Sequence, residues 1–203
     1  MLPRKSRGCA GIDLEEEEQI IGNERKGQDG LAWNAAHLAG AGTLELGSPD
    51  FEHHGALPIV HASTRVGGHE LSPALTWTPA PEGTAQLLLV IEDPDAPMPR
   101  PFVHCVALLD ASSTALARGA LNAANPGNGV RVLRSTVGRG YFGPMPPKSH
   151  GPHRYVFQLF ALATPVTVGS ISDAVDSAPP GQVMAAAAGV LARGRLDGFF
   201  QRT

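Results

Sequence analysis

The alternation of apolar and polar residues predicts a chain built from short β-strands. Residues 87–91 (LLLVI), 102–109 (FVHCVALL) and 154–162 (RYVFQLFAL) are short apolar runs rich in branched side chains. Such runs favour strands that are covered on both faces over helices, which need a longer stretch. Residues 43–46 (TLEL) alternate polar and apolar before the turn residues 47–49 (GSP), and they predict a further strand.

One segment has the pattern of a helix. Residues 183–193 (VMAAAAGVLAR) follow Pro179 and Pro180 and precede Gly194, so proline stands at the start and glycine at the end. The chain is therefore expected to be mainly β: a Greek-key antiparallel β-sandwich with one or two peripheral helices, including this one near the C-terminus.

The length and the N-terminal composition predict one domain with an extension. A chain of 203 residues accommodates one domain, expected over residues 43–203. Residues 1–42 combine a basic start, a run of four glutamates and several glycines, which is typical of a mobile tail. Alternatively, Leu31, Trp33 and Leu38 dock on the body as a short helix, because a tryptophan ring is a large apolar surface to leave in water.

Composition and charge exclude several classes of protein. The net charge of -3 lacks the excess of lysine and arginine that a nucleic-acid surface needs. The chain has no run of about 18 apolar residues, so no membrane span is expected. Cys9 and Cys105 do not make a disulfide framework, and the N-terminus lacks the apolar stretch of a signal peptide. We therefore expect a soluble protein of the reducing cytoplasm.

Two loops concentrate the residues that could carry chemistry. Residues 93–97 (DPDAP) end a predicted strand, and their prolines fix the backbone so that Asp93 is held in one place. Residues 140–155 (GYFGPMPPKSHGPHRY) form a second stiff loop that ends in His153 and Tyr155. Side chains alternate along a strand, so these last two are expected to face the same side.

The same alternation places His104 on one face with Val106 and Leu108, opposite Cys105. We therefore expect Cys105 to be a buried apolar residue and not the partner of His104. A structural reading stays open for each polar residue, because a strand histidine is more often structural than a ligand and Asp93 can simply close its own turn. Imidazoles, a tyrosine hydroxyl and free backbone N–H groups are also what a small anion site needs.

The sequence contains no established metal, nucleophile or nucleotide motif. His150 and His153 are three residues apart, but that spacing presents two ligands together only on a helix, which Gly151 and Pro152 exclude. No G-x-S-x-G or G-x-G-x-x-G motif occurs. We expect neither a metal nor a cofactor.

Several stretches together make the sequence similar to the phosphatidylethanolamine-binding protein family, also called the Raf kinase inhibitor protein family, and to its bacterial branch in particular. They are residues 71–77 (LSPALTW), 93–97 (DPDAP), His104, 143–147 (GPMPP) and 153–155 (HRY), in the family's order. The resemblance runs from about residue 43 to the end of the chain, with a C-terminal helix ending near residues 191–192 and a short final strand.

The resemblance implies a Greek-key β-sandwich with a small pocket for phosphate, phosphorylethanolamine or a similar anion. The residues that it implies for this pocket are Asp93, His104, His153 and Tyr155, with Gly143, Met145, Pro146 and Pro147 as wall and backbone. The sequence departs from the family at Phe102, where tryptophan or a second histidine is frequent.

The expected function follows from the resemblance. Members of the family are better known as binding and regulatory proteins than as enzymes, so we expect a protein that binds a small anionic ligand and regulates a partner protein. Two alternatives stay open. One is an enzyme that uses the Asp, His and Tyr side chains for general acid–base chemistry, and the other is an inhibitor of a kinase or a protease.

Overall fold

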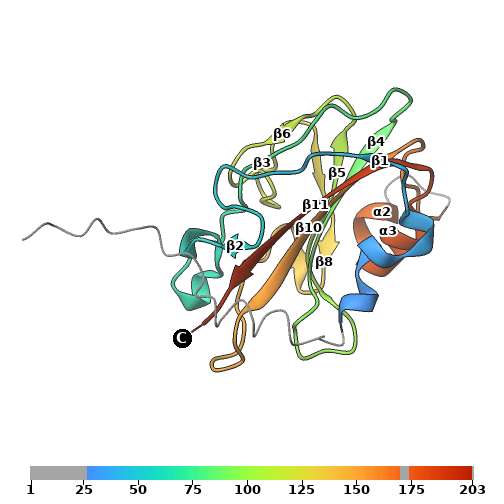
Figure 1. Cartoon of the computed structure of the whole chain (residues 1–203). Coiled ribbons are helices and arrows are strands. Elements are labelled where there is room, and N and C mark those ends of the chain that lie inside the picture. The colour runs from blue at the N-terminus through green and yellow to red at the C-terminus, as the bar shows by residue number, and fades with distance from the viewer. Residues whose placement is uncertain (1–26, 170–173, 203) are drawn as a thin grey trace, which may run out of the picture.

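A seven-stranded sheet forms the centre of the protein, seen in Figure 1 in a computed structural model that describes residues 27–169 and 174–202. Its strands are β1 (Gly42–Thr43), β2 (Gly55–Ala56), β4 (Gln86–Asp93), β5 (Phe102–Asp110), β7 (Val130–Val132), β10 (His153–Leu162) and β11 (Val190–Phe200). The spatial order is β1-β11-β10-β4-β5-β7, and β2 also pairs with β11. β1 and β2 run parallel to β11, whereas the other pairs are antiparallel.

Short elements surround this sheet. Two further ladders pair β3 (Leu75–Thr76) with β6 (Ala115–Leu116) and β8 (Arg134–Ser135) with β9 (Gly138–Arg139). The helices are η1 (Gln28–Gly30), η2 (Ala32–Asn34), η3 (Ala36–Leu38), η4 (Ile59–His61), η5 (Thr64–Val66), α2 (Ala174–Ser177) and α3 (Pro180–Ala186). In these parts of the chain no helix has the length and apolar character needed to cross a bilayer. The predicted mainly β fold is confirmed, and the Greek-key sandwich connectivity stays a prediction.

The two faces of the sheet carry two separate hydrophobic cores. Alternate residues of β4, starting at Leu87, face the first core, and those starting at Leu88 face the second. Every residue from Leu87 to Ile91 is fully buried, which confirms that this run is covered on both faces. β3 and β6 contribute to the first core, while α2, α3 and the blue N-terminal segment of Figure 1 cover the second.

Polar contacts hold residues 27–38, the N-terminal segment, on the second face. The buried Glu92 carboxylate accepts hydrogen bonds from the Ala32 backbone N–H and the Gln158 side-chain amide, both at 2.8 Å. The Gln158 carbonyl oxygen in turn accepts the Trp33 backbone N–H at 2.6 Å. The Arg193 guanidinium lies 4.0 Å from the centroid of the Trp33 ring. The acidic run in residues 1–26 lies outside the described residues.

The expected helix over residues 183–193 is confirmed only over residues 183–186 and is wrong from residue 187 onward. The helix α3 ends at Ala186, and Gly189 has a φ of 68°, in the left-handed region that favours glycine. Residues 190–193 instead begin β11, an 11-residue strand where a short one was expected. The reason is tertiary: Ala192 pairs with Gly42 of β1 and with β10, and this pairing overrides the helix propensity of the alanine run.

The expected strand over residues 43–46 is shorter and displaced. β1 covers Gly42–Thr43, after which Leu44 and Leu46 are buried in the first core and Gly47 forms a bridge to Thr76. The alternation over residues 43–46 therefore predicted correctly that Leu44 and Leu46 point into the core, although the pairing of β1 with β11 ends at Thr43.

Candidate functional site

A β-bulge in β5 decides where His104 points. In the pairing of β5 with β4, Cys105 lies opposite Ile91 and Val103 lies opposite Glu92, which leaves His104 unpaired. The expectation that His104 shares the face of Val106 and Leu108 is therefore wrong. Its ring centroid lies 5.0 Å from that of Tyr155, whose side chain belongs to the first core.

Cys105 belongs to the first core as well, so the bulge puts two neighbouring residues on one face. The thiol is fully buried, and burial raises the pKa of Cys105 far above its usual range. Cys105 is therefore the buried apolar residue that the sequence predicted, and it is not a thiolate nucleophile.

Asp93, the last residue of β4, holds His153, the first residue of β10. One oxygen, Oδ1, accepts the backbone N–H groups of Asp95 and Ala96 at 2.8 and 3.1 Å. The other, Oδ2, lies 2.7 Å from His153 Nδ1, and both side chains are buried. Asp93 therefore closes its own turn, which confirms its structural role, and it also orients an imidazole, while its role in binding a ligand stays a prediction.

Among the described residues, the His104 imidazole is hydrogen-bonded through Nδ1 alone. Its Nδ1 lies 2.6 Å from the Phe142 carbonyl oxygen, and the Phe142 N–H donates to the His104 carbonyl oxygen at 2.9 Å. Because a carbonyl oxygen only accepts, Nδ1 carries the proton, and in the neutral ring Nε2 is an acceptor. Burial lowers the pKa of His104, and the charge of Asp93 acts in the opposite direction.

The Tyr155 hydroxyl is a buried donor at the same end of the sheet. Among the described residues it has no hydrogen-bond partner of standard geometry, although the Met145 backbone lies near enough to affect it. Burial, reinforced by the charge of Asp93, raises the pKa of Tyr155 well above its ordinary value. The hydroxyl therefore keeps its proton and can donate it in a hydrogen bond.

Residues 143–147 form a wall that packs against the loop of η4 and η5. The Gly143 N–H donates to Glu70 Oε1 at 3.3 Å, and the Pro144 carbonyl oxygen accepts the Ser63 N–H at 3.0 Å. A Cβ at Gly143 would lie 2.5 Å from the His61 carbonyl oxygen, so only glycine fits this approach. The remaining wall residues differ in burial, with Met145 half-buried, Pro146 buried and Pro147 exposed.

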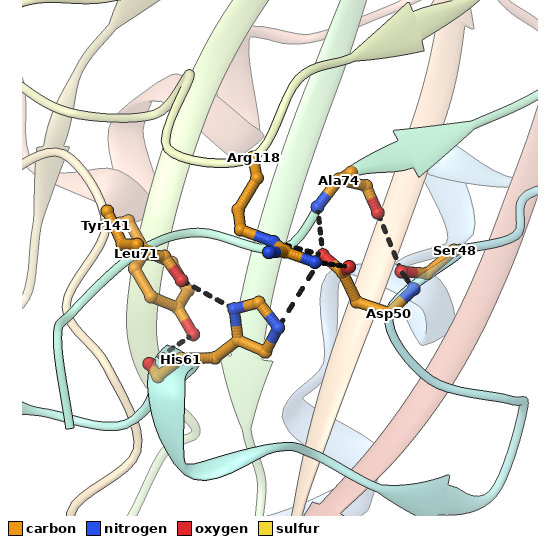
Figure 2. A network of polar contacts seen from close by, with 7 residues as sticks. All are labelled: Ser48, Asp50, His61, Leu71, Ala74, Arg118 and Tyr141. Atoms are coloured by element: carbon orange, nitrogen blue, oxygen red, sulfur yellow. Dashed lines mark hydrogen bonds and ion pairs between the residues drawn. The ribbon is translucent and has the colours of Figure 1, made fainter.

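Figure 2 shows a polar network around His61, whose carbonyl oxygen is the atom that a Cβ at Gly143 would meet. The Tyr141 hydroxyl donates to the His61 carbonyl oxygen at 3.1 Å, and His61 Nδ1 lies 2.8 Å from the Leu71 carbonyl oxygen. His61 Nε2 is 3.6 Å from Asp50 Oδ2, a carboxylate that also binds Arg118. Arg118 lowers the pKa of Asp50, and burial lowers the pKa of His61. The neutral His61 ring is thus held in place by Leu71, next to residues 61–63, the part of the η4–η5 loop that contacts Gly143.

Two residues near the site were missed by the sequence reasoning. His150 Nδ1 lies 2.7 Å from His153 Nε2, so the expectation that only a helix could join these two rings is wrong. The chain turns instead through Ser149 at φ 60° and Gly151 at φ 79°. Phe142 is the second missed residue, and its ring stacks on that of His104 with 6.0 Å between the ring centroids. Within the described residues, no three His, Cys, Asp or Glu side chains are arranged to hold a metal ion.

The four polar residues implied by the resemblance therefore come together from three central strands. Asp93 and His153 share a hydrogen bond, His104 and Tyr155 share a ring contact, and Asp93 acts electrostatically on both of the latter. The sequence profile of the phosphatidylethanolamine-binding protein family matches residues 47–201. The chain belongs to this family.

Relatives and solved structures agree with this membership. A UPF0098 protein of Aquifex aeolicus is 35% identical over 126 residues, which cover 62% of this chain and 71% of that protein. The UPF0098 protein YbhB of Escherichia coli is 35% identical over 59% of this chain and 78% of its own length. The crystal structure of E. coli YbcL, described as a new member of the mammalian PEBP family, superposes with a TM-score of 0.68 at 26% identity, covering 79% of this chain and 99% of YbcL.

Proposed function

We propose that this protein binds small phosphate-bearing anions, such as the phosphorylethanolamine head group, at Asp93, His104, His153 and Tyr155. The observation that carries the proposal is the Tyr155 hydroxyl, a buried donor without a standard hydrogen-bond partner among the described residues. A buried polar group left without a partner costs about 1–3 kcal/mol, so a ligand oxygen that accepts from it is stabilised.

Each of these residues would have its own role in binding the anion. Tyr155 donates to a phosphate oxygen, and His104 donates through Nε2 once it is protonated. Both ring nitrogens of His153 are already hydrogen-bonded, to Asp93 and to His150, so this ring shapes the site without donating to the ligand. Asp93 orients His153 through their 2.7 Å contact. The wall residues, Gly143, Met145, Pro146 and Pro147, supply backbone and shape on one side. The liganded protein would regulate a partner protein, a kinase or a protease, in the cytoplasm, without a cofactor.

Isothermal titration calorimetry with O-phosphorylethanolamine and with inorganic phosphate tests this proposal. Tyr155→Phe removes only the hydroxyl and should weaken binding at least about tenfold, because a hydrogen bond to a charged group contributes about 1.5–3 kcal/mol. Asp93→Ala and His153→Ala should abolish saturable binding. Tyr141→Phe is the matched comparison: it removes a partly buried tyrosine hydroxyl that donates to the His61 carbonyl oxygen, so it should weaken binding less than Tyr155→Phe does.

Two results would contradict the proposal. One is a folded wild-type protein that binds neither compound. The other is binding that Tyr155→Phe and Tyr141→Phe reduce to the same extent, because the effect would then belong to packing and not to the ligand site.

A further inference from the structure

Three side chains form a continuous line from the buried end of the sheet to the surface. Asp93 Oδ2 lies 2.7 Å from His153 Nδ1, and His153 Nε2 lies 2.7 Å from His150 Nδ1. The Asp93 and His153 side chains are almost fully buried, with 5% and 1% of their surfaces exposed, whereas His150 is exposed. The first hydrogen bond is therefore shielded from water, and the last ring of the line meets solvent.

The Asp93 carboxylate, which only accepts hydrogen bonds, decides which nitrogens of His153 and His150 carry protons. The Asp93 carboxylate has no proton to give, and its Oδ1 already accepts two backbone N–H groups. His153 Nδ1 must therefore carry a proton, which leaves Nε2 of the neutral ring as an acceptor. His150 Nδ1 then donates to that nitrogen, and the lone pair of His150 is placed on Nε2, its outer ring nitrogen.

We propose that His150 is a phosphoryl-accepting nucleophile activated by His153 and Asp93. The order of groups is that of an Asp-His-nucleophile relay, with an imidazole in the place of a hydroxyl. In the reaction, the Nε2 lone pair of His150 forms an N–P bond while the bond between phosphorus and the leaving group breaks. The Nδ1 proton of His150 moves to His153 Nε2, and the resulting imidazolium is stabilised by the Asp93 carboxylate. His150 thus ends as a neutral Nε2-phosphoimidazole.

The choice of a phosphoryl donor rests on the proposed anion site. Among the described residues, the groups near the relay are the His104 ring and the Tyr155 hydroxyl, together with the Asp93 carboxylate within the relay and the Asp95 carboxylate. The Tyr155 hydroxyl can donate to an anionic oxygen, and this hydrogen bond favours a donor that carries a phosphoryl group. The nearby Asp95 carboxylate binds the Arg154 backbone N–H at 2.7 Å and is buried. The simplest donor is phosphoramidate in its zwitterionic form, whose nitrogen already carries three protons, so neutral ammonia leaves phosphorus and no further reactant is needed.

Phosphoramidate labelling followed by mass spectrometry tests the proposal. The full chain is incubated with potassium phosphoramidate at about pH 8, where ordinary histidines are neutral, and it is digested without acid because phosphohistidine is acid-labile. His69 is the internal reference, since it is exposed and has no side-chain partner among the described residues. His150 should be phosphorylated at least about tenfold faster than His69, given the usual effect of an adjacent base.

The Asp93→Asn variant reverses the direction of the hydrogen bonds in the relay and conserves the size and shape of the side chain. The amide oxygen takes the place of Oδ1, which accepts two N–H groups, so the NH₂ group faces His153 Nδ1 and donates to it. His153 then donates to His150 Nδ1, and the His150 lone pair no longer lies on Nε2. Labelling of His150 should fall to the rate of His69, while labelling of His69 itself should not change.

Nitrogen-15 NMR of the wild-type protein gives an independent readout of the same claim. His150 should show a protonated Nδ1 and an unprotonated Nε2, the opposite of the form that free histidine prefers in water. An Nε2-protonated His150, a labelling rate equal to that of His69, or a rate that Asp93→Asn leaves unchanged would each overturn the relay. Calorimetry with phosphate separates the two proposals: absent binding together with fast labelling of His150 would overturn the anion site and not the relay.

Discussion

At the residue scale, the protonation state of His104 decides whether its Nε2 can donate a hydrogen bond to the proposed anion. In the neutral ring, Nδ1–H donates to the Phe142 carbonyl oxygen, so Nε2 carries a lone pair and faces the site as an acceptor. Burial holds the pKa of His104 below its ordinary value of 6.5, so the ring is mostly neutral at pH 7. An anion that accepts from Nε2 therefore has to bind together with a proton.

This coupling predicts that affinity rises as pH falls. A bound anion raises the pKa of His104, so the affinity increases with acidity between the pKa of the bound state and that of the free state. Inorganic sulfate is the appropriate probe, because its charge is constant between about pH 5.5 and 8.5, the range around the ordinary histidine value. Calorimetry should show stronger binding at the acidic end, and His104→Gln should make the dependence shallower. An affinity for sulfate that stays constant over this range would exclude histidine protonation as a source of binding.

The sequence predicted most of the residues in this site and missed their connections. Asp93, His153 and Tyr155 follow from a stiff DPDAP loop and from alternation along one strand. His150 could not be placed in the same way, because its contact with His153 depends on a non-glycine residue, Ser149, with φ 60°. No local propensity indicates such a conformation for serine, so only the folded loop reveals it.

At the element scale, irregularities in the strands position the site. Nothing in residues 102–109 (FVHCVALL) interrupts the alternation, yet the bulge rotates His104 toward Tyr155. The partners that accompany the bulge are distant in sequence: Phe142 binds His104, and Thr136 Oγ1 accepts the Val103 N–H at 2.9 Å. Sequence reasoning finds the strand because the apolar run is local, and it misses the bulge because these partners are not.

The wall of the site gives a test at the same scale. A Cβ at position 143 would lie 2.5 Å from the His61 carbonyl oxygen and 2.6 Å from the Ser63 nitrogen, so Gly143→Ala has to displace the wall. We expect the variant to bind O-phosphorylethanolamine at least about tenfold more weakly and to lose about 1–3 kcal/mol of unfolding free energy, the usual cost of overpacking.

Gly181→Ala is the matched control, because a Cβ there meets nothing within 4 Å and the residue lies in α3. It should leave binding unchanged and stabilise the helix by up to about 1 kcal/mol. Denaturant unfolding and calorimetry measure both quantities. If Gly143→Ala bound the ligand as well as Gly181→Ala does, the wall would have no part in recognition.

At the scale of the whole molecule, the N-terminal segment is joined to the strand that supplies the site. Glu92 accepts the Ala32 N–H on the second face, and its neighbour Asp93 binds His153 on the first. Gly27 lies so close to the DPDAP loop that an added Cβ would be 2.1 Å from the Pro94 carbonyl oxygen. One strand end therefore supports both the segment behind the sheet and the site in front of it.

Substitution of Glu92 separates the hydrogen bonds of this side chain from its charge. Glu92→Leu removes the acceptor for Ala32 and Gln158, so hydrogen exchange of the Ala32 amide should accelerate and unfolding free energy should fall by about 1–3 kcal/mol. Glu92→Gln keeps an oxygen acceptor and should preserve slow exchange.

The charge adds a pH dependence of known sign. Burial raises the pKa of Glu92 above its ordinary 4.5, so the folded state holds this proton more tightly than the unfolded chain does. The contribution of Glu92 to stability is thus greatest in acid and declines as pH rises from about 4.5 to the pKa of the folded state. Glu92→Gln does not titrate, so its stability relative to the wild type should improve over that same interval and then level off. Equal destabilisation by Glu92→Gln and Glu92→Leu at neutral pH would instead mean that the carboxylate charge, and not an oxygen acceptor, holds the N-terminal segment on the sheet.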